Sequence, residues 1–295
     1  MTPTTSSSEL ANALEDTTAG TITLGDRPVR RLGFGAMRIT GSGIWGPPED
    51  HDGAVAVLRR AVELGINLVD TANSYGPEVS ENLIAEALYP YPDDLVIATK
   101  GGLVRPGPGQ WDPNGRPEHL REECEGSLRR LRLERILLYQ FHRPDPDVPL
   151  EESVGALAEL RDEGKIVHVG LSNVSVEELR RAQAIVPIVS VQNRYNLVER
   201  DDEDVLQACD ADGLAFIPWF PLKTGELATH DLAAKIAKAH DATPTQVALA
   251  WLLAHSPVML PIPGTSSVAH LEENVAAAHV RLSKDEIEAL DAGAK

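Results

Sequence analysis

The chain has 295 residues, 42% of them hydrophobic, which is enough for one large globular domain with a sizeable core. Its formal net charge is −18 at pH 7, which argues against nucleic acid and anionic membranes as partners, because both require a basic surface. No stretch approaches the roughly 18 consecutive apolar residues of a membrane span. The two cysteines, Cys124 and Cys209, are too few for a disulfide framework, and we interpret them as ordinary buried or surface thiols of a cytoplasmic protein.

The chain opens with a polar segment. Residues 1–20 are rich in Thr, Ser and Ala and contain neither a basic start nor an apolar stretch. This composition predicts a disordered tail rather than a secretory signal. Apolar runs at 21–24 and 29–32 then flank Gly25-Asp26, which predicts a β-hairpin with a tight turn. Residues 32–37 form the first candidate strand of a larger sheet.

From residue 52 onward, segments with helical spacing of apolar residues alternate with short apolar runs. The candidate helices are 52–64, 80–88, 117–131, 150–163, 175–184, 203–210, 232–240, 246–255, 268–279 and 283–292. The further candidate strands are 66–69, 95–99, 136–141, 167–171, 188–192, 215–218 and 258–262. This alternation requires a parallel sheet, and eight strand–helix units favour a closed (β/α)8 TIM barrel over an open sheet. No linker divides the chain, so we expect one α/β domain over residues 21–295.

Three consecutive strands end in polar residues of complementary chemistry. Asp70 and Tyr75 follow the strand at 66–69, Lys100 follows the next strand, and His142 follows the third. The carboxyl ends of barrel strands converge on one face, so we expect these four side chains to meet. Tyr75 would donate a proton to a carbonyl, the Lys100 ammonium would lower its pKa, and Asp70 would hold Lys100 in place. His142 would orient the carbonyl oxygen in a site shielded from water.

This set of residues resembles the catalytic tetrad of the aldo-keto reductases, of the bacterial type with a short C-terminal loop. The resemblance extends over roughly residues 21–290. It implies NADPH-dependent reduction of aldehydes or ketones to alcohols by hydride transfer, with Tyr75 as the general acid. A small carbonyl compound would be the partner, no metal is implied, and the oligomeric state stays open.

The resemblance also implies a cofactor site. The segment Gly33-Phe34-Gly35 and the residues after it resemble the loop that approaches the nicotinamide, and Trp219 resembles the aromatic residue that stacks on the ring. The residues assigned to the cofactor in this way are Gly35, Ala36, Met37, Ser172, Asn173, Gln192, Trp219, Phe220, Pro221, Leu222, Lys223, Ile262, Pro263, Gly264, Thr265, Ser266, His270, Glu273 and Asn274.

The chain departs from the family pattern where the 2′-phosphate of NADPH would bind. Many members carry Lys and Arg at the positions of Gly264 and His270. Thr265, Ser266 and His270 would bind a phosphate here with less fixed charge. The family resemblance still implies NADPH as the cofactor, with use of NADH as the alternative.

Two tryptophans on glycine-rich loops, Trp45 and Trp111, predict a substrate pocket for an apolar or aromatic aldehyde or ketone. The short C-terminal segment predicts an open pocket of broad specificity. Two other functions remain open at this point. Lys100 could form a Schiff base in an aldolase, or the chain could bind the cofactor without turnover, as in the similar potassium-channel β subunits. A metal hydrolase fits less well, because no pair of ligands has typical spacing.

Overall fold

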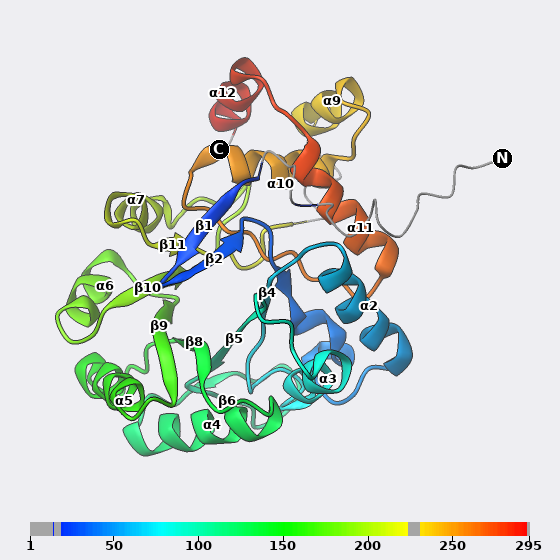
Figure 1. Ribbon diagram of the computed structural model, residues 1–295. Coiled ribbons are helices and arrows are strands. Elements are labelled where there is room, and N and C mark those ends of the chain that lie inside the picture. Colours follow the sequence, from blue (N-terminus) through cyan, green and yellow to red (C-terminus); the bar gives the residue numbers. More distant parts are fainter. Residues whose placement is uncertain (1–13, 15–18, 224–230, 294–295) are drawn as a thin grey trace.

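The computed structural model describes residues 14, 19–223 and 231–293 (Figure 1). Its strands are β1 (Thr21–Leu24), β2 (Arg27–Arg30), β3 (Phe34–Gly35), β4 (Leu68–Asp70), β5 (Val96–Gly101), β6 (Leu103–Val104), β7 (Asp112–Pro113), β8 (Ile136–Phe141), β9 (Ile166–Ser172), β10 (Ile188–Gln192) and β11 (Ala215–Phe216). Its helices are α2 (His51–Glu63), α3 (Val79–Leu88), α4 (Pro117–Arg130), α5 (Leu150–Asp162), α6 (Val176–Gln183), α7 (Glu203–Asp212), α9 (Asp231–Ala239), α10 (Pro244–His255), α11 (Val268–Ala276) and α12 (Lys284–Ala292). Short 3-10 turns are η1 (Ala36–Ile39), η2 (Ser42–Ile44) and η3 (Ala277–His279).

The main sheet is parallel and has the strand order β11-β10-β9-β8-β5-β4-β3. Residues 258–262 lie between its two edges. The Phe216 amide donates to the Val258 carbonyl at 2.9 Å on one side, and the Gly33 amide donates to the Pro261 carbonyl at 3.0 Å on the other. The sheet therefore closes around this eighth segment. Helices surround the strands in Figure 1, and the closure confirms the predicted (β/α)8 barrel.

Two predicted strands differ most from the structure. The strand expected at 32–37 is only β3, because Ala36–Ile39 turns into the helical turn η1. The segment at 258–262 makes a bridge through Met259 but no continuous strand. Prolines at 261 and 263 lack the N–H that a sheet ladder needs, which explains the irregularity. Each predicted helix has a counterpart in the described residues, with ends that shift by only a few residues.

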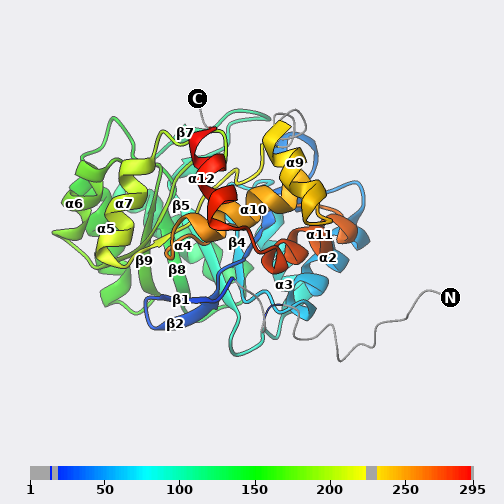
Figure 2. The same cartoon turned by 90° about the horizontal axis from the view of Figure 1, so that it is seen from above.

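The hairpin β1–β2 covers one end of the barrel. Its side chains Leu24 and Val29 are buried in one cluster with the first residues of three strands, which are Leu68, Val96 and Ala215. The predicted hairpin is confirmed, and it closes the amino-terminal end of the barrel. Figure 2 shows the hairpin and strand β7 at opposite ends of the barrel. The carboxyl-terminal end is thus left for a site.

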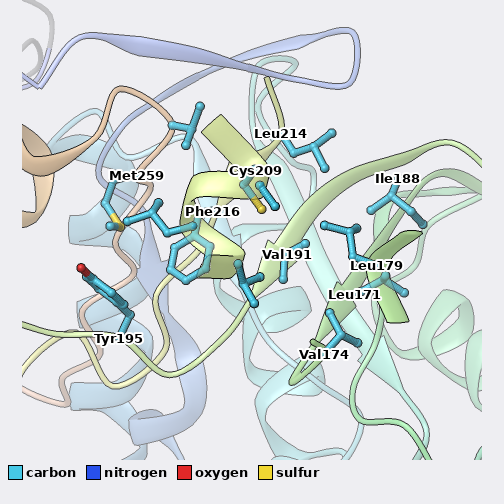
Figure 3. Close-up of a cluster of buried hydrophobic side chains, with 14 of the residues drawn as sticks. Leu171, Val174, Leu179, Ile188, Val191, Tyr195, Cys209, Leu214, Phe216 and Met259 are labelled. Carbon is cyan, nitrogen blue, oxygen red and sulfur yellow. The ribbon is translucent and has the colours of Figure 1, made fainter. Parts of the chain in front are cut away.

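The outer faces of the strands pack against the surrounding helices. Figure 3 shows this layer around β9, β10 and β11, where Leu171, Val191 and Phe216 lie among residues of α6 and α7. Cys209 on α7 is fully buried there, and Cys124 on α4 is fully buried as well. Burial raises the pKa of both thiols to about 12, so both stay protonated at neutral pH.

Most of the predicted tail, residues 1–20, lies outside the described residues, and its disorder stays a prediction. Of its described members, Leu14 and Ala19 are buried beside the first barrel strands. No helix in the described part of the chain combines the length and apolarity needed to cross a membrane.

Two glycines make the joint between β3 and the eighth segment possible. A Cβ atom on Gly35 would lie 2.6 Å from the Ile262 carbonyl oxygen, and one on Gly264 would lie 2.5 Å from the Gly35 carbonyl oxygen. These are contacts between main chains, so neither neighbour can rotate away.

We therefore expect Gly35→Ala to lower the free energy of unfolding by about 1–3 kcal/mol, because the joint must shift to admit a methyl group. Urea denaturation measures this loss. Gly155→Ala on α5 is the matched control, since its Cβ would meet nothing within 4 Å. That control should be neutral or stabilising by up to about 1 kcal/mol, as expected for Gly→Ala within a helix. Equal stability of the two variants would contradict the close approach.

Candidate active site

Four polar side chains converge at the carboxyl-terminal end of the barrel, as predicted from the strand ends. Asp70 is the last residue of β4, Lys100 is the fifth residue of β5, and His142 follows β8 directly. Tyr75 lies on the loop between β4 and α3. All four side chains are buried, with at most 7% of their surface exposed.

Lys100 is held by three oxygen atoms. Its ammonium lies 2.6 Å from the Asp70 carboxylate, 2.8 Å from the Thr71 carbonyl and 3.4 Å from the Tyr75 hydroxyl. Burial alone would lower the pKa of Lys100, but the adjacent Asp70 carboxylate outweighs burial and raises the pKa. The side chain is therefore a fixed cation. A Schiff base requires a neutral amine, so this geometry disfavours the aldolase alternative.

The second carboxylate oxygen of Asp70 is satisfied by two amides. The side chains of Gln140 and Gln192 each donate to it at 2.9 Å. Gln140 was missed by the sequence analysis. Its signal was available, because a polar residue at an alternating, inward position of the strand at 136–141 must meet a partner inside the barrel. Gln192 was assigned to the cofactor, and it both contacts Asp70 and lines the cavity described below.

The Tyr75 hydroxyl is protonated at neutral pH. Burial raises its pKa above the ordinary value, the Lys100 ammonium acts in the opposite direction, and the Asp70 charge raises the pKa again. The predicted lowering of this pKa by Lys100 is present, but burial outweighs it and the net shift is upward. A protonated phenol is the form that a general acid requires, and Lys100 remains placed to stabilise the phenolate that forms.

His142 packs edge-on against the Tyr75 ring, with ring centroids 5.9 Å apart. Burial and then the charges of Lys100 and Arg143 place its pKa well below the ordinary value, so the imidazole is neutral. The Ser74 hydroxyl lies 3.4 Å from its Nδ1 atom. When Ser74 donates to Nδ1, the ring proton resides on Nε2 and His142 can donate one hydrogen bond without competing with Tyr75 as an acid.

A cavity of about 880 Å³ opens above these residues. Its volume is near the upper end of the roughly 300–1,000 Å³ of ligand sites. Asp70, Tyr75 and His142 line it, as does the predicted substrate residue Trp111. The predicted cofactor residues that line it are Gly35, Met37, Ser172, Asn173, Gln192, Trp219, Phe220, Pro221, Leu222, Ile262, Pro263, Gly264, Thr265 and Ser266.

The remaining predicted residues lie outside this lining, and they are Ala36, Trp45, Lys223, His270, Glu273 and Asn274. Lys223 pairs with Glu199 at 2.8 Å. Glu273 accepts a hydrogen bond from Thr243 at 2.7 Å, next to the start of α10. The role of all six in binding stays a prediction. Arg38 and Arg143 line the cavity and were not assigned to it beforehand.

The two proposed nicotinamide-binding side chains are joined to each other. The Trp219 indole N–H donates to the Asn173 side-chain oxygen at 3.1 Å, and the Asn173 amide donates to the His142 carbonyl at 3.0 Å. Asn173 has a φ of 59°, in the left-handed region that asparagine tolerates better than most residues. Arg194 lies over the Trp219 ring at 5.6 Å. The indole is thus fixed relative to the catalytic strand ends.

The far end of the cavity lies at the amino terminus of α11. Gly264, Thr265 and Ser266 line it there, and Ser267 caps the helix by accepting from the His270 amide. Backbone amides, hydroxyl groups and the helix dipole suit a phosphate at this position. The donor set of the cavity as a whole therefore fits a nicotinamide dinucleotide. Within the described residues, no group of three or more His, Cys, Asp or Glu side chains is arranged to hold a metal ion.

Known proteins are similar to this chain in sequence and in fold. The family model described as "Aldo/keto reductase family" matches residues 31–295. An uncharacterized oxidoreductase of Schizosaccharomyces pombe is 52% identical over 282 residues, which cover 95% of this chain and 92% of that protein. The pyridoxine 4-dehydrogenase of Escherichia coli is 43% identical, with coverage of 92% and 98%. A crystal structure of an aldo-keto reductase from Klebsiella pneumoniae in complex with NADPH matches with a TM-score of 0.78 and 28% identity, covering 92% of this chain and 94% of that one.

Proposed function

Because the chain belongs to the aldo/keto reductase family, we propose that it reduces aldehydes or ketones to alcohols with NADPH, and that Tyr75 is the general acid. One observation carries the proposal. The protonated Tyr75 hydroxyl lies 3.4 Å from a Lys100 ammonium that Asp70 holds at 2.6 Å, and Tyr75 lines a cavity large enough for a cofactor and a substrate.

NADPH supplies the hydride when it is bound. As the carbonyl carbon is reduced, negative charge develops on its oxygen, and Tyr75 transfers its phenolic proton to that oxygen. Loss of this proton converts Tyr75 to a phenolate, which the neighbouring Lys100 ammonium stabilises. The neutral His142 imidazole donates a hydrogen bond that orients the same oxygen. Asp70 keeps Lys100 in position without taking the proton itself.

The cofactor would lie across the cavity from the nicotinamide side to α11. Trp219 would stack on the nicotinamide ring, and Ser172 and Asn173 would hold its carboxamide. Thr265 and Ser266 would bind the adenosine phosphate. The Klebsiella pneumoniae relative that binds NADPH supports the choice of NADPH, while the lack of a fixed cation at Gly264 leaves NADH as an alternative to be measured.

We expect His270→Arg to increase the affinity for NADPH by about three- to tenfold and to leave the affinity for NADH nearly unchanged. The reason is that a permanent positive charge in the first turn of α11 lies close to the proposed site of the 2′-phosphate. Cofactor titration by fluorescence measures both constants. His279→Arg adds the same charge at the exposed position 279 of η3 and is the matched control. An equal gain for both cofactors would contradict the assigned position of the phosphate.

The substrate class is proposed to be aromatic and other apolar carbonyl compounds. Trp111 lines the cavity, and the Escherichia coli relative is named for pyridoxine, an aromatic alcohol. Pyridoxal and benzaldehyde are therefore the first substrates to test, by the loss of NADPH absorbance. Turnover that disappears in Tyr75→Phe would support the reductase. Tight cofactor binding without turnover on a broad panel of carbonyls would instead favour the cofactor-sensing alternative.

A further inference from the structure

One arginine joins three loops at the mouth of the cavity. These are the loop of residues 41–46 after β3, the loop of residues 71–78 that carries Tyr75, and the hairpin of residues 103–113, which contains β6 and β7. Arg105 follows β6 in the hairpin, and its side chain contacts all three loops. It does not line the cavity itself, so its effect on the site must pass through its neighbours.

The hydrogen bonds of Arg105 go to main-chain carbonyls of each loop. Its Nη1 atom donates to the Ile44 and Ser74 carbonyls, both at 3.0 Å, and its Nε atom donates to the Gln110 carbonyl at 2.7 Å. Ser74 is the residue directly before Tyr75. The guanidinium can reach three acceptors at once because its donors are fixed in one plane, which a lysine ammonium on a flexible stem cannot reproduce.

Two indole rings flank the same guanidinium. The Arg105 Cζ atom lies 3.5 Å from the centroid of the Trp111 ring and 5.5 Å from that of Trp45. Its Nη2 atom is buried and has no hydrogen-bond partner in the structure. The cation–π contacts with the two rings therefore replace part of the hydration that this atom has lost. Such compensation exists only while both tryptophan loops are in place.

The position of Trp111 bears directly on the acid. Its ring meets the Tyr75 ring edge-on, with centroids 6.4 Å apart and planes at 77°. On the other side, the Gly46 amide donates to the Gly76 carbonyl at 2.7 Å, which ties the loop of Trp45 to the residue after Tyr75. Trp45 lies against Arg105 and outside the cavity lining, and its predicted place in the substrate pocket stays a prediction.

We propose that Arg105 is a positioning residue that locks the three loops together, so that Trp111 forms a fixed wall of the substrate pocket and Tyr75 is held in line for proton transfer. This inference rests on the proposed reductase function for its kinetic consequences. Its structural consequence, the joint ordering of three loops by one side chain, does not depend on that function.

The kinetic test uses Arg105→Lys and Arg105→Met in the full-length protein. We expect kcat/KM for benzaldehyde to fall by about 10- to 100-fold, since small misplacements of catalytic groups have effects of this size. The loss should appear mainly in kcat, it should be smaller for propanal, which is too small to touch the Trp111 wall, and the Kd for NADPH should stay within about twofold. Arg105→Lys should not rescue the rate, because the charge alone does not recreate the three hydrogen bonds.

A matched control exists elsewhere in the chain. Arg200 lies 4.4 Å from the Trp251 ring centroid and donates to the Leu197, Leu290 and Asp291 carbonyls, away from the cavity lining. Arg200→Lys removes a similar stacked arginine and should leave kcat for benzaldehyde unchanged. An equal loss of kcat in the Arg200 and Arg105 variants would overturn the proposal.

Hydrogen exchange supplies a readout that needs no turnover. We expect amides in all three loops to exchange faster in Arg105→Lys, while those of β8 and β9 stay protected. Faster exchange confined to the hairpin of residues 103–113 would contradict the joint ordering of the three loops by Arg105, whatever the kinetics show. Failure of the wild-type protein to reduce any carbonyl would contradict the proposed function alone, and the exchange data would then decide on Arg105.

Discussion

Replacing Tyr75 by phenylalanine is expected to lower kcat for carbonyl reduction by about 10²- to 10⁴-fold, the usual contribution of a general acid. The substitution removes one oxygen atom and leaves the ring, which packs against His142 and Trp111. The fold and the shape of the cavity should therefore persist. The Kd for NADPH should stay within about twofold, because the hydroxyl contacts Lys100 rather than the proposed cofactor residues.

The measurement is the loss of NADPH absorbance with benzaldehyde, combined with a fluorescence titration of NADPH. Tyr91→Phe is the matched control, since it also removes a hydroxyl with a hydrogen bond, here to the Leu131 carbonyl at 2.8 Å. Because burial raises the pKa of Tyr75, the acid stays protonated through neutral pH, and the reduction rate of the wild-type protein should not fall between about pH 6 and 8. A Tyr75→Phe variant with full activity would remove Tyr75 from the mechanism.

Replacing Lys100 by methionine is expected to abolish measurable reduction and to lower the free energy of unfolding by about 3–5 kcal/mol. The reason is that the Asp70 carboxyl group, with 2% of its surface exposed, would be left in the interior without the ammonium 2.6 Å away. Lys165→Met is the matched control. Lys165 pairs with Glu125 and Glu163 at the surface, so its loss should cost at most about 1 kcal/mol.

The double variant Asp70→Asn with Lys100→Met separates stability from activity. Removing both charges eliminates the unpaired carboxylate, so urea denaturation should show recovery of much of the lost stability. Activity should stay lost, because nothing stabilises the Tyr75 phenolate. Recovery of activity in the double variant would contradict the role given to Lys100. If stability did not recover, the unpaired Asp70 carboxylate would not be the cause of the stability loss in Lys100→Met.

The strand ends at the heart of the site were predictable because a parallel barrel places chemistry at fixed points of a repeating pattern. Asp70, Lys100 and His142 each come at the end of a short apolar run, and this position alone places them at the carboxyl-terminal end of the barrel. The length of the strand predicted at 32–37 was overestimated, because apolar composition does not show where the backbone turns. Apolar composition continues through Ala36 and Met37, whereas the backbone has already turned into η1.

Other features depended on three-dimensional surroundings that no local pattern contains. The upward shift of the Tyr75 pKa follows from burial, which only the assembled cavity creates. The family resemblance assigns His270 and Glu273 to the cofactor but does not show the direction in which each side chain points. Neither residue lines the cavity. Arg105 lies in a glycine-rich loop, where its contacts with Ile44 and Ser74 could not be inferred from separations of 61 and 31 residues.

The eighth segment of the barrel, residues 258–262, joins its neighbours through few main-chain hydrogen bonds, and the Arg31 side chain supplements them by donating to the Met259 carbonyl at 3.1 Å. Gly35 on one side of this joint and Gly264 on the other both line the cavity. A dinucleotide bound there would contact residues on both sides of this joint. Binding of the cofactor would then stabilise the closed barrel. Without the cofactor, local opening of the barrel would begin at the joint between residues 258–262 and β3.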